Sequence, residues 1–142
     1  MVCRMVKFHS MKKQVFIFWL MLIVSGMRTA VAQNITFCKA ADSDGQAVST
    51  AKEFTLTKTG AAIVLLFQFG NAKPASISYD LYKAEKGNEV FQSTLKQVVT
   101  PGKNWVSKSI TLYDAGLYRV YVYDEKDKLL TKSEFTVKPA GN

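Results

Sequence analysis

Few side chains in this 142-residue sequence have the chemistry of an active site, and several of them lie at its N-terminus. The single histidine, His9, and one of the two cysteines, Cys3, precede a long apolar run. If that N-terminal segment is removed, the mature chain has no histidine for a Ser–His or Cys–His nucleophile pair or for a metal. The remaining cysteine, Cys38, cannot form a thiolate zinc site alone. We therefore predict a chain that is not an enzyme and has no catalytic residue, cofactor or metal site.

The acidic residues all follow Gln33, and most lie in sequences typical of turns. A glycoside hydrolase would need two placed carboxylates, but Asp124, Glu125 and Asp127 sit together in a short charged segment. The segment Asp42-Ser43-Asp44-Gly45 resembles the start of a calcium-binding loop, yet the later glutamate of an EF-hand is missing at the required spacing. The sequence contains no G-x-G-x-x-G or P-loop motif. We interpret these acidic segments as solvated turns.

Aromatic residues supply the remaining candidate site. Because alternate residues of a strand face opposite sides, inward Tyr118, Val120 and Val122 would leave an arginine and two tyrosines pointing outward. A third tyrosine and an aspartate would point outward from the strand around residues 77–82, which we expect to pair with the strand that contains Tyr118. A tryptophan at a loop edge could join them. The candidate binding residues are Tyr82, Asp80, Arg119, Tyr121, Tyr123 and Trp105. Tyr, Trp and Arg are typical anchors for protein partners, but cross-strand tyrosines that only stabilise a sheet give the same pattern.

The apolar run VFIFWLMLIV, residues 15–24, follows two lysines and precedes Ala30-Val31-Ala32. A basic segment, an apolar stretch of about 7–15 residues and small residues before a cleavage point are typical of a secretory signal peptide. The run is shorter than the roughly 20 apolar residues that span a bilayer. We predict that residues 1–32 are a signal peptide, and that the mature chain is periplasmic or extracellular without a membrane span. Met11 is an alternative start that gives a more compact signal.

Cleavage would change the charge of the protein. The full sequence has a net charge of +8, but five of its 19 Lys and Arg residues and none of its 11 acidic residues precede Gln33. The mature chain would carry 14 basic and 11 acidic residues, a net charge of +3. Because these charges are spread along the chain, they predict no nucleic-acid partner. Cys38 follows Thr36-Phe37 rather than small residues, so we expect no lipid anchor. It would be buried as a thiol or paired between chains.

After Gln33, short runs of period two alternate with turn residues at roughly 8–12-residue spacing, which predicts an antiparallel sandwich or barrel. The most apolar run, residues 61–69, is expected in the middle of a sheet, and the more polar residues 90–99 near an edge. Seven strands are predicted to begin near Phe54, Ala61, Ile77, Val90, Val106, Leu117 and Leu129. Residues 33–51 are interpreted as an N-terminal extension, 52–138 as the folded domain and 139–142 as a C-terminal tail.

The segment Asp114-Ala115-Gly116-Leu117-Tyr118 resembles the D-x-G-x-Y signature of immunoglobulin-like and fibronectin type III-like β-sandwiches. The resemblance implies an all-β, seven-stranded antiparallel Greek-key immunoglobulin-like β-sandwich, in which the Tyr118 hydroxyl bonds to backbone upstream. Val120 stands where that family has a cysteine, which implies an apolar pair with a residue such as Leu65 in place of the disulfide. Tyr79 would take the core place of the antibody tryptophan. The residues that carry the resemblance are Asp114, Gly116 and Tyr118.

Fold alone does not determine function. The sequence favours an exported, non-catalytic binding or accessory module that contacts a protein partner, or another copy of itself, through the aromatic sheet face. The alternative is a carbohydrate-binding module that stacks sugars on Trp105 and the same tyrosines. A flat, coplanar row of rings would favour sugar, whereas a broad patch would favour a protein.

Overall fold

The computed structural model describes residues 33–141, and these residues form nine β-strands. In chain order the strands are β1 (Asn34–Ala41), β2 (Ala47–Thr50), β3 (Glu53–Thr55), β4 (Ala61–Gln68), β5 (Ser76–Glu85), β6 (Asn88–Val98), β7 (Trp105–Leu112), β8 (Gly116–Tyr123) and β9 (Leu129–Lys138). Within this part of the chain, no helix is long and apolar enough to cross a membrane. The predicted signal peptide, the start at Met11 and the cleavage after Ala32 lie outside the described residues.

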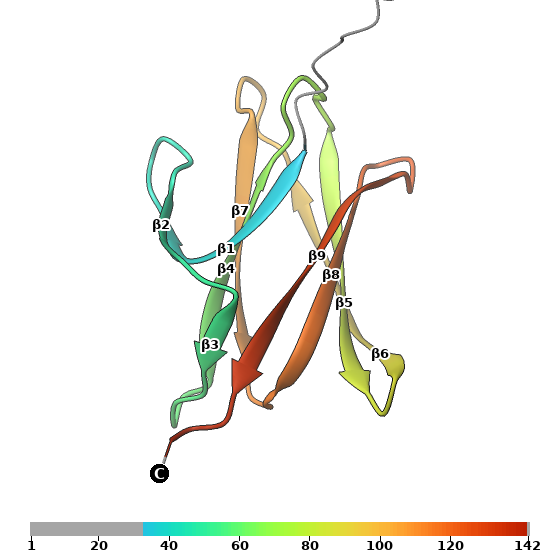
Figure 1. Cartoon of the computed structure of the whole chain (residues 1–142). Coiled ribbons are helices and arrows are strands. Elements are labelled where there is room, and N and C mark those ends of the chain that lie inside the picture. The colour runs from blue at the N-terminus through green and yellow to red at the C-terminus, as the bar shows by residue number, and fades with distance from the viewer. Residues whose placement is uncertain (1–32, 142) are drawn as a thin grey trace, which may run out of the picture. The chain divides into compact units, whose positions relative to one another are not determined.

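The strands form two sheets packed face to face (Figure 1). One sheet has four strands in the order β2-β1-β4-β7, and the other has five in the order β3-β9-β8-β5-β6. β8 follows the tyrosine corner and lies between β5 and β9, the place of the corresponding strand in immunoglobulin-like domains. β4 lies inside its sheet and β6 at an edge, as their sequences predict. The structure confirms an all-β, immunoglobulin-like sandwich.

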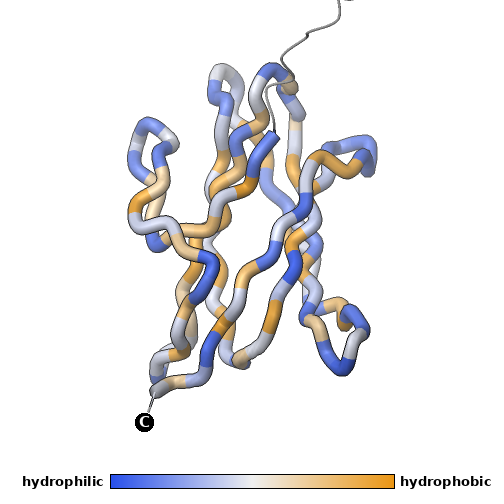
Figure 2. Tube along the Cα trace, in the orientation of Figure 1, coloured by the Kyte–Doolittle hydropathy of each residue, from blue (hydrophilic) through white to orange (hydrophobic). Residues whose placement is uncertain are grey.

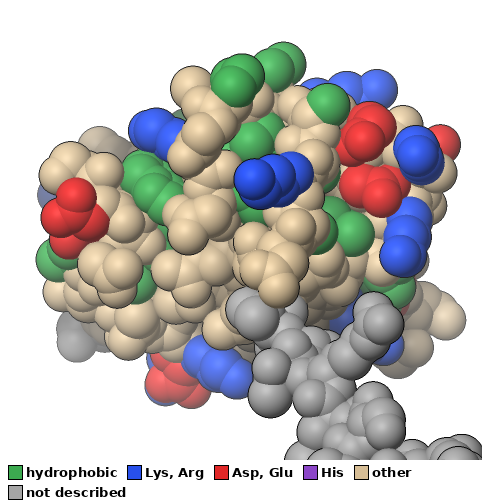
Figure 3. All heavy atoms as spheres, turned by 90° about the horizontal axis from the view of Figure 1, so that it is seen from above, with side chains coloured by type: hydrophobic (Ala, Val, Ile, Leu, Met, Phe, Trp, Pro, Cys, Tyr) green, Lys and Arg blue, Asp and Glu red, His purple; other side chains and the backbone are tan. Residues whose placement is uncertain are grey.

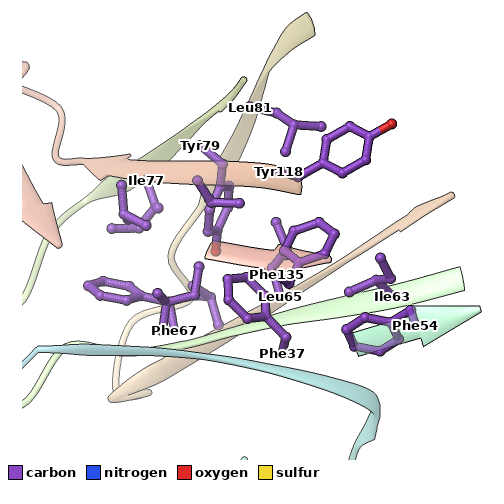
Figure 4. Close-up of a cluster of buried hydrophobic side chains, with 14 of the residues drawn as sticks. Phe37, Phe54, Ile63, Leu65, Phe67, Ile77, Tyr79, Leu81, Tyr118 and Phe135 are labelled. Carbon is purple, nitrogen blue, oxygen red and sulfur yellow. The ribbon is translucent and has the colours of Figure 1, made fainter. Parts of the chain in front are cut away.

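Alternating apolar side chains fill the space between the sheets, and Figure 2 shows hydrophobic and hydrophilic residues interleaved along the strands. Leu65 and Phe67 of β4 are at most 1 % exposed. Phe135 of β9 lies among other rings, with its centroid 4.8 Å from that of Phe37 and 5.9 Å from that of Phe54 (Figure 4). Because each fully buried side chain of this size contributes about 1.5–3 kcal/mol, this layer supplies the stability that holds both sheets in place.

Tyr118 forms the corner that the sequence resemblance implies. Its hydroxyl donates a hydrogen bond to the backbone oxygen of Asp114 at 2.9 Å. Its buried ring stacks on Phe135, with centroids 5.6 Å apart and ring planes inclined by 12°. Gly116 has a φ of 155°, which disfavours a side chain, and a Cβ there would lie 2.7 Å from Cε of Lys83. Asp114, Gly116 and Tyr118 therefore set the turn into β8.

A polar relay closes the side of the sandwich where β6 and β7 lie. The hydroxyl of Tyr79, a fully buried residue, donates to Oε1 of Gln97 at 3.3 Å. Nε2 of Gln97 donates in turn to the backbone oxygen of Ser107 at 2.8 Å. Burial raises the pKa of the Tyr79 hydroxyl well above its ordinary value. Tyr79 thus lies in the core where the resemblance places it, and Gln97 joins the two sheets.

The N-terminal boundary of the domain differs from the prediction. Residues 33–51 are not an extension, because β1 pairs with β4 from Asn34 opposite Gln68 to Cys38 opposite Val64. Ile35 and Phe37 are buried in the core, so the short alternation around Thr36 was a strand signal. The sandwich has nine strands rather than seven, and β1 and β2 are the additional ones. These strands are hard to predict because the chain leaves one sheet after β2 and joins the other at β3.

Candidate functional site

Five of the six candidate residues lie on the outer face of the five-stranded sheet. β5 and β8 pair antiparallel, with Tyr82 opposite Arg119 and Asp80 opposite Tyr121, which confirms the predicted pairing. The intervening Leu81 and Val120 are buried, so the candidate side chains point away from the core. We call this surface the tyrosine face. Its residues are Asp80, Tyr82, Glu89, Phe91, Arg119, Tyr121, Tyr123, Lys132 and Glu134.

Three rings form a row across β6, β5 and β8. The Tyr82 ring lies between the other two, 5.4 Å from Tyr121 and 5.6 Å from Phe91 between centroids. The planes are inclined by 79° and 70°, so both contacts are edge-to-face, an arrangement that aromatic pairs prefer. The two tyrosines are half-buried and Phe91 is 54 % exposed. The row is a continuous but uneven apolar surface.

Phe91 is a member of the site that sequence reasoning missed. The register of β5 and β6 shifts at this point: Tyr82 pairs with Phe91, whereas the adjacent Leu81 pairs with Ser93. Gln92 is the additional residue of a β-bulge. The bulge interrupts the period-two pattern of β6, so alternation alone does not show that Phe91 faces outward. A bulge is set by both strands, which explains why one strand's sequence did not reveal it.

Arg119 of β8 lies between a carboxylate of the adjacent β9 and a carboxylate of β6, which lies beyond β5. Its Nη1 contacts Oε1 of Glu89 at 2.8 Å, and its Nε contacts Oε2 of Glu134 at 3.2 Å. The hydroxyl of Tyr121 also donates to Oε1 of Glu89, at 2.9 Å. The hydrogen bonds from Arg119 and then Tyr121 lower the pKa of the Glu89 carboxyl, and the same bonds raise the pKa of both donors. These contacts fix the orientation of Arg119 on an otherwise exposed surface.

A shallow hollow of about 410 Å³ opens beside this network. Its lining residues are Glu89, Arg119, Tyr121, Lys132, Ser133 and Glu134. Two of these side chains are acidic and two are basic, so the hollow has no strong charge of one sign. Figure 3 shows acidic and basic side chains close together on one end of the molecule as well. Among residues 33–141, no group of three His, Cys, Asp or Glu side chains is placed to hold a metal ion.

Asp80 and Tyr123 complete the tyrosine face toward one end of the sheet. Oδ1 of Asp80 accepts a hydrogen bond from the Thr94 hydroxyl at 2.6 Å, which links β5 to β6. Tyr123 pairs with Ser78 and is half-buried. Partial burial and then the nearby Asp80 carboxylate raise the pKa of the Tyr123 hydroxyl, which keeps it protonated. Both residues lie where the sequence places them, and Asp80 holds a cross-strand contact.

Trp105 does not belong to this face, and this part of the prediction is wrong. It is in β7 of the four-stranded sheet, opposite Gln68 of β4. The adjacent Val106 is buried, so Trp105 points away from the core on the other side of the sandwich. Its ring packs under Gly45, where a Cβ would lie 2.3 Å from the ring, and Nζ of Lys103 is 4.6 Å from the ring centroid. Trp105 anchors the β1–β2 loop.

Comparison with solved structures supports the fold. An immunoglobulin-like protein from Pseudomonas aeruginosa superposes with a TM-score of 0.52 at 18 % identity, over 80 % of this chain and 100 % of that one. A superoxide reductase (neelaredoxin) from Ignicoccus hospitalis gives 0.40 at 14 % identity over 63 % of this chain and 74 % of that one. A CARDB domain from Pyrococcus furiosus, in complex with di-metal ions, gives 0.41 at 13 % over 78 % and 90 %. No protein-family model and no curated protein matches the sequence. The first similarity shows an immunoglobulin-like fold.

Proposed function

We propose that this chain is an exported, non-catalytic module that binds a protein partner through the tyrosine face. The observation that carries the proposal is the row of Phe91, Tyr82 and Tyr121 beside an oriented Arg119. Aromatic residues and arginine are enriched among the residues that dominate protein interfaces. The signal-like N-terminal sequence supports export, and an immunoglobulin-like fold is suited to a binding or accessory domain.

The charged network favours a binding role over a purely structural one. Both ion pairs of Arg119 are exposed, and exposed ion pairs contribute little to stability. The same contacts hold the long Arg119 side chain in one orientation. Ordering a side chain of this kind on binding costs about 0.5–1.5 kcal/mol. A side chain that is already oriented avoids much of that cost, so the network lowers the entropic cost of forming a complex.

The ring geometry favours a protein over a carbohydrate. Stacking on a sugar needs flat, exposed ring faces, but neighbouring rings of this row are inclined by 70° and 79°. The Tyr121 hydroxyl is already bonded to Glu89, and Trp105 lies on the other sheet. An uneven surface of partly exposed rings, with both charge signs beside it, matches the mixed composition of protein interfaces. Carbohydrate binding therefore stays the alternative.

Site-specific photo-crosslinking in the native cells tests this proposal. A photoreactive residue replaces Lys132, which lines the hollow, and in a control it replaces Thr111, which is exposed on the four-stranded sheet. We expect a defined protein adduct from position 132 and none from position 111. Tyr121→Ala should then weaken binding of the purified partner about tenfold or more. Tyr113→Ala, which removes a tyrosine 73 % exposed outside the face, should leave it unchanged.

Two results would overturn the proposal. Equal adducts from both positions would show that contact with the tyrosine face is not selective. Binding to immobilised glycans that disappears in a Tyr121→Ala/Tyr123→Ala variant would favour the carbohydrate alternative. Thermal unfolding of each variant shows whether lost binding reflects lost folding.

A further inference from the structure

The free edge of β6 is the least protected edge of the two sheets. β6 is the longest described strand, with 11 residues, and it pairs only with β5. Phe91 and Val98 on this strand are 54 % and 80 % exposed. The edge strands β2 and β3 have only four and three residues, and the edge strand β7 is bridged at Ser107 by Gln97. A long, exposed edge of this kind is a template for pairing with another strand.

The backbone directions along β6 determine which residues could pair. The Val99 N–H donates to the Ala75 oxygen, so alternation directs the backbone groups of Thr94 and Lys96 to the free edge. At the other end, Lys86-Gly87 is a two-residue hairpin loop with φ of 50° and 81°, which directs Asn88 toward Glu85. Glu89 and Phe91 therefore also direct their backbone groups to the free edge. The bulge at Gln92 separates these two pairs of residues by three positions and lets the backbone groups of both pairs point to the free edge.

One antiparallel, two-fold register satisfies these constraints. It pairs Glu89 with the second copy's Lys96, and Phe91 with the second copy's Thr94, through residues whose backbone groups face the free edge. The outer faces of both strands coincide, because Glu89, Phe91, Thr94 and Lys96 all lie on the outer side of the sheet. On the inner side, Val90 meets the second copy's Leu95. Opposite charges and apolar pairs directly across a ladder are favourable.

The neighbouring registers are poorer. The bulge changes the phase of β6 at its centre. A shift by two residues in either direction therefore places an outward side chain of one copy opposite an inward side chain of the other at the centre of the ladder. Registers that match sides without using the bulge are confined to one half of β6 and pair fewer residues, and the one centred on Lys96 places it opposite the second copy's Lys96, where like charges are destabilising. The register with Glu89 opposite Lys96 also leaves the Arg119 contact in place, since Arg119 and Tyr121 bond chiefly to Oε1 of Glu89.

We propose that two copies of this chain join through β6 into one continuous antiparallel sheet, with Glu89 of each copy paired to Lys96 of the other. The two tyrosine faces then form one surface, which goes beyond the proposed binding function and does not depend on it. A two-fold contact of this kind uses the same strand on both copies and closes on itself. It also removes the free edge that would otherwise invite aggregation.

Sedimentation equilibrium of the purified protein over a concentration series measures this association. We expect a monomer–dimer equilibrium. Lys96→Glu places acidic residues opposite each other twice in the dimer, so it should weaken association about tenfold or more. Lys58→Glu makes the same charge change in the exposed β3–β4 turn and should have no effect. A monomer at every concentration, or a dimer that Lys96→Glu leaves intact, would overturn the proposal.

Disulfide trapping tests the register. Directly opposite residues of an antiparallel pair lie within the Cα separation that a disulfide accepts. A mixture of Phe91→Cys and Thr94→Cys proteins should therefore form a mixed disulfide dimer under mild oxidation. The Phe91→Cys protein alone should not form a disulfide dimer, because position 91 of one copy lies three positions away from position 91 of the other in this register. Equal crosslinking in both samples would contradict the register, and neither outcome decides whether a partner binds the tyrosine face.

Discussion

Replacing Gln97 by leucine should destabilise the protein through the loss of a buried hydrogen bond. Gln97→Leu keeps a side chain of similar size, but it leaves the Tyr79 hydroxyl without its acceptor and the Ser107 oxygen without its donor. A buried polar group left unsatisfied costs about 1–3 kcal/mol. Ser107 is only half-buried and lies at a sheet edge, so water can replace that partner. We expect a cost of about 2 kcal/mol, set mainly by Tyr79.

A second substitution separates this mechanism from a simple change in packing. Tyr79→Phe in the native background removes one hydrogen bond and should cost about 0.5–1.5 kcal/mol. In the Gln97→Leu background the same change removes the orphaned hydroxyl, so it should have no cost or should restore stability. The sign of the Tyr79→Phe effect is therefore expected to differ between the two backgrounds.

Urea unfolding of the four proteins, followed by far-ultraviolet circular dichroism, gives the free energies of unfolding. Low protein concentration keeps association from contributing to the measured stability. The coupling energy of the double-mutant cycle should be about 1 kcal/mol or more. If Tyr79→Phe costs the same in both backgrounds, the two side chains are not coupled and the relay does not join the sheets as described.

Three further measurements follow from single contacts. Tyr118→Phe should lower the free energy of unfolding by about 0.5–1.5 kcal/mol, because it loses the bond to the Asp114 oxygen but keeps the ring; an unchanged urea midpoint would contradict this. The pKa of Glu89 lies below its ordinary value of 4.5, so its stabilising contact with Arg119 is present above that pH and lost as the pH falls through the lowered pKa, which a carboxyl titration by NMR follows. The Glu89→Gln variant should lack this transition. Cys38 is fully buried and burial raises the pKa of its thiol, so a thiol reagent should react only after unfolding.

Local patterns predicted much of this fold because they depend on a few adjacent residues. The corner at Tyr118 is formed within five residues of chain, and its hydrogen bond follows directly from the motif. The pairing of β5 with β8 followed from the family topology, so the outward tyrosines were placed correctly. β1 was missed because its buried alternation around Ile35 is short and lies beside the predicted cleavage site.

The rest of the site depends on contacts between distant segments. Phe91 joins the row because a bulge, formed jointly by β5 and β6, shifts the phase of one strand. Glu89 follows a charged turn sequence, and its role comes from Arg119, which is 30 residues further along the chain. Trp105 was assigned to the wrong face because its position depends on which sheet β7 joins. These features are properties of pairing between strands and are not visible in any one segment.

The proposed function rests on the claim that partner contact is confined to the tyrosine face. Backbone-amide NMR spectra recorded during titration with the crosslinked partner measure this directly. The account predicts that the largest shift changes lie in β5 and β8, around Tyr82 and Tyr121, and that Trp105 and the outer residues of β4 are unaffected. Changes centred on Trp105 and the four-stranded sheet, with Tyr82 and Tyr121 unperturbed, would contradict it.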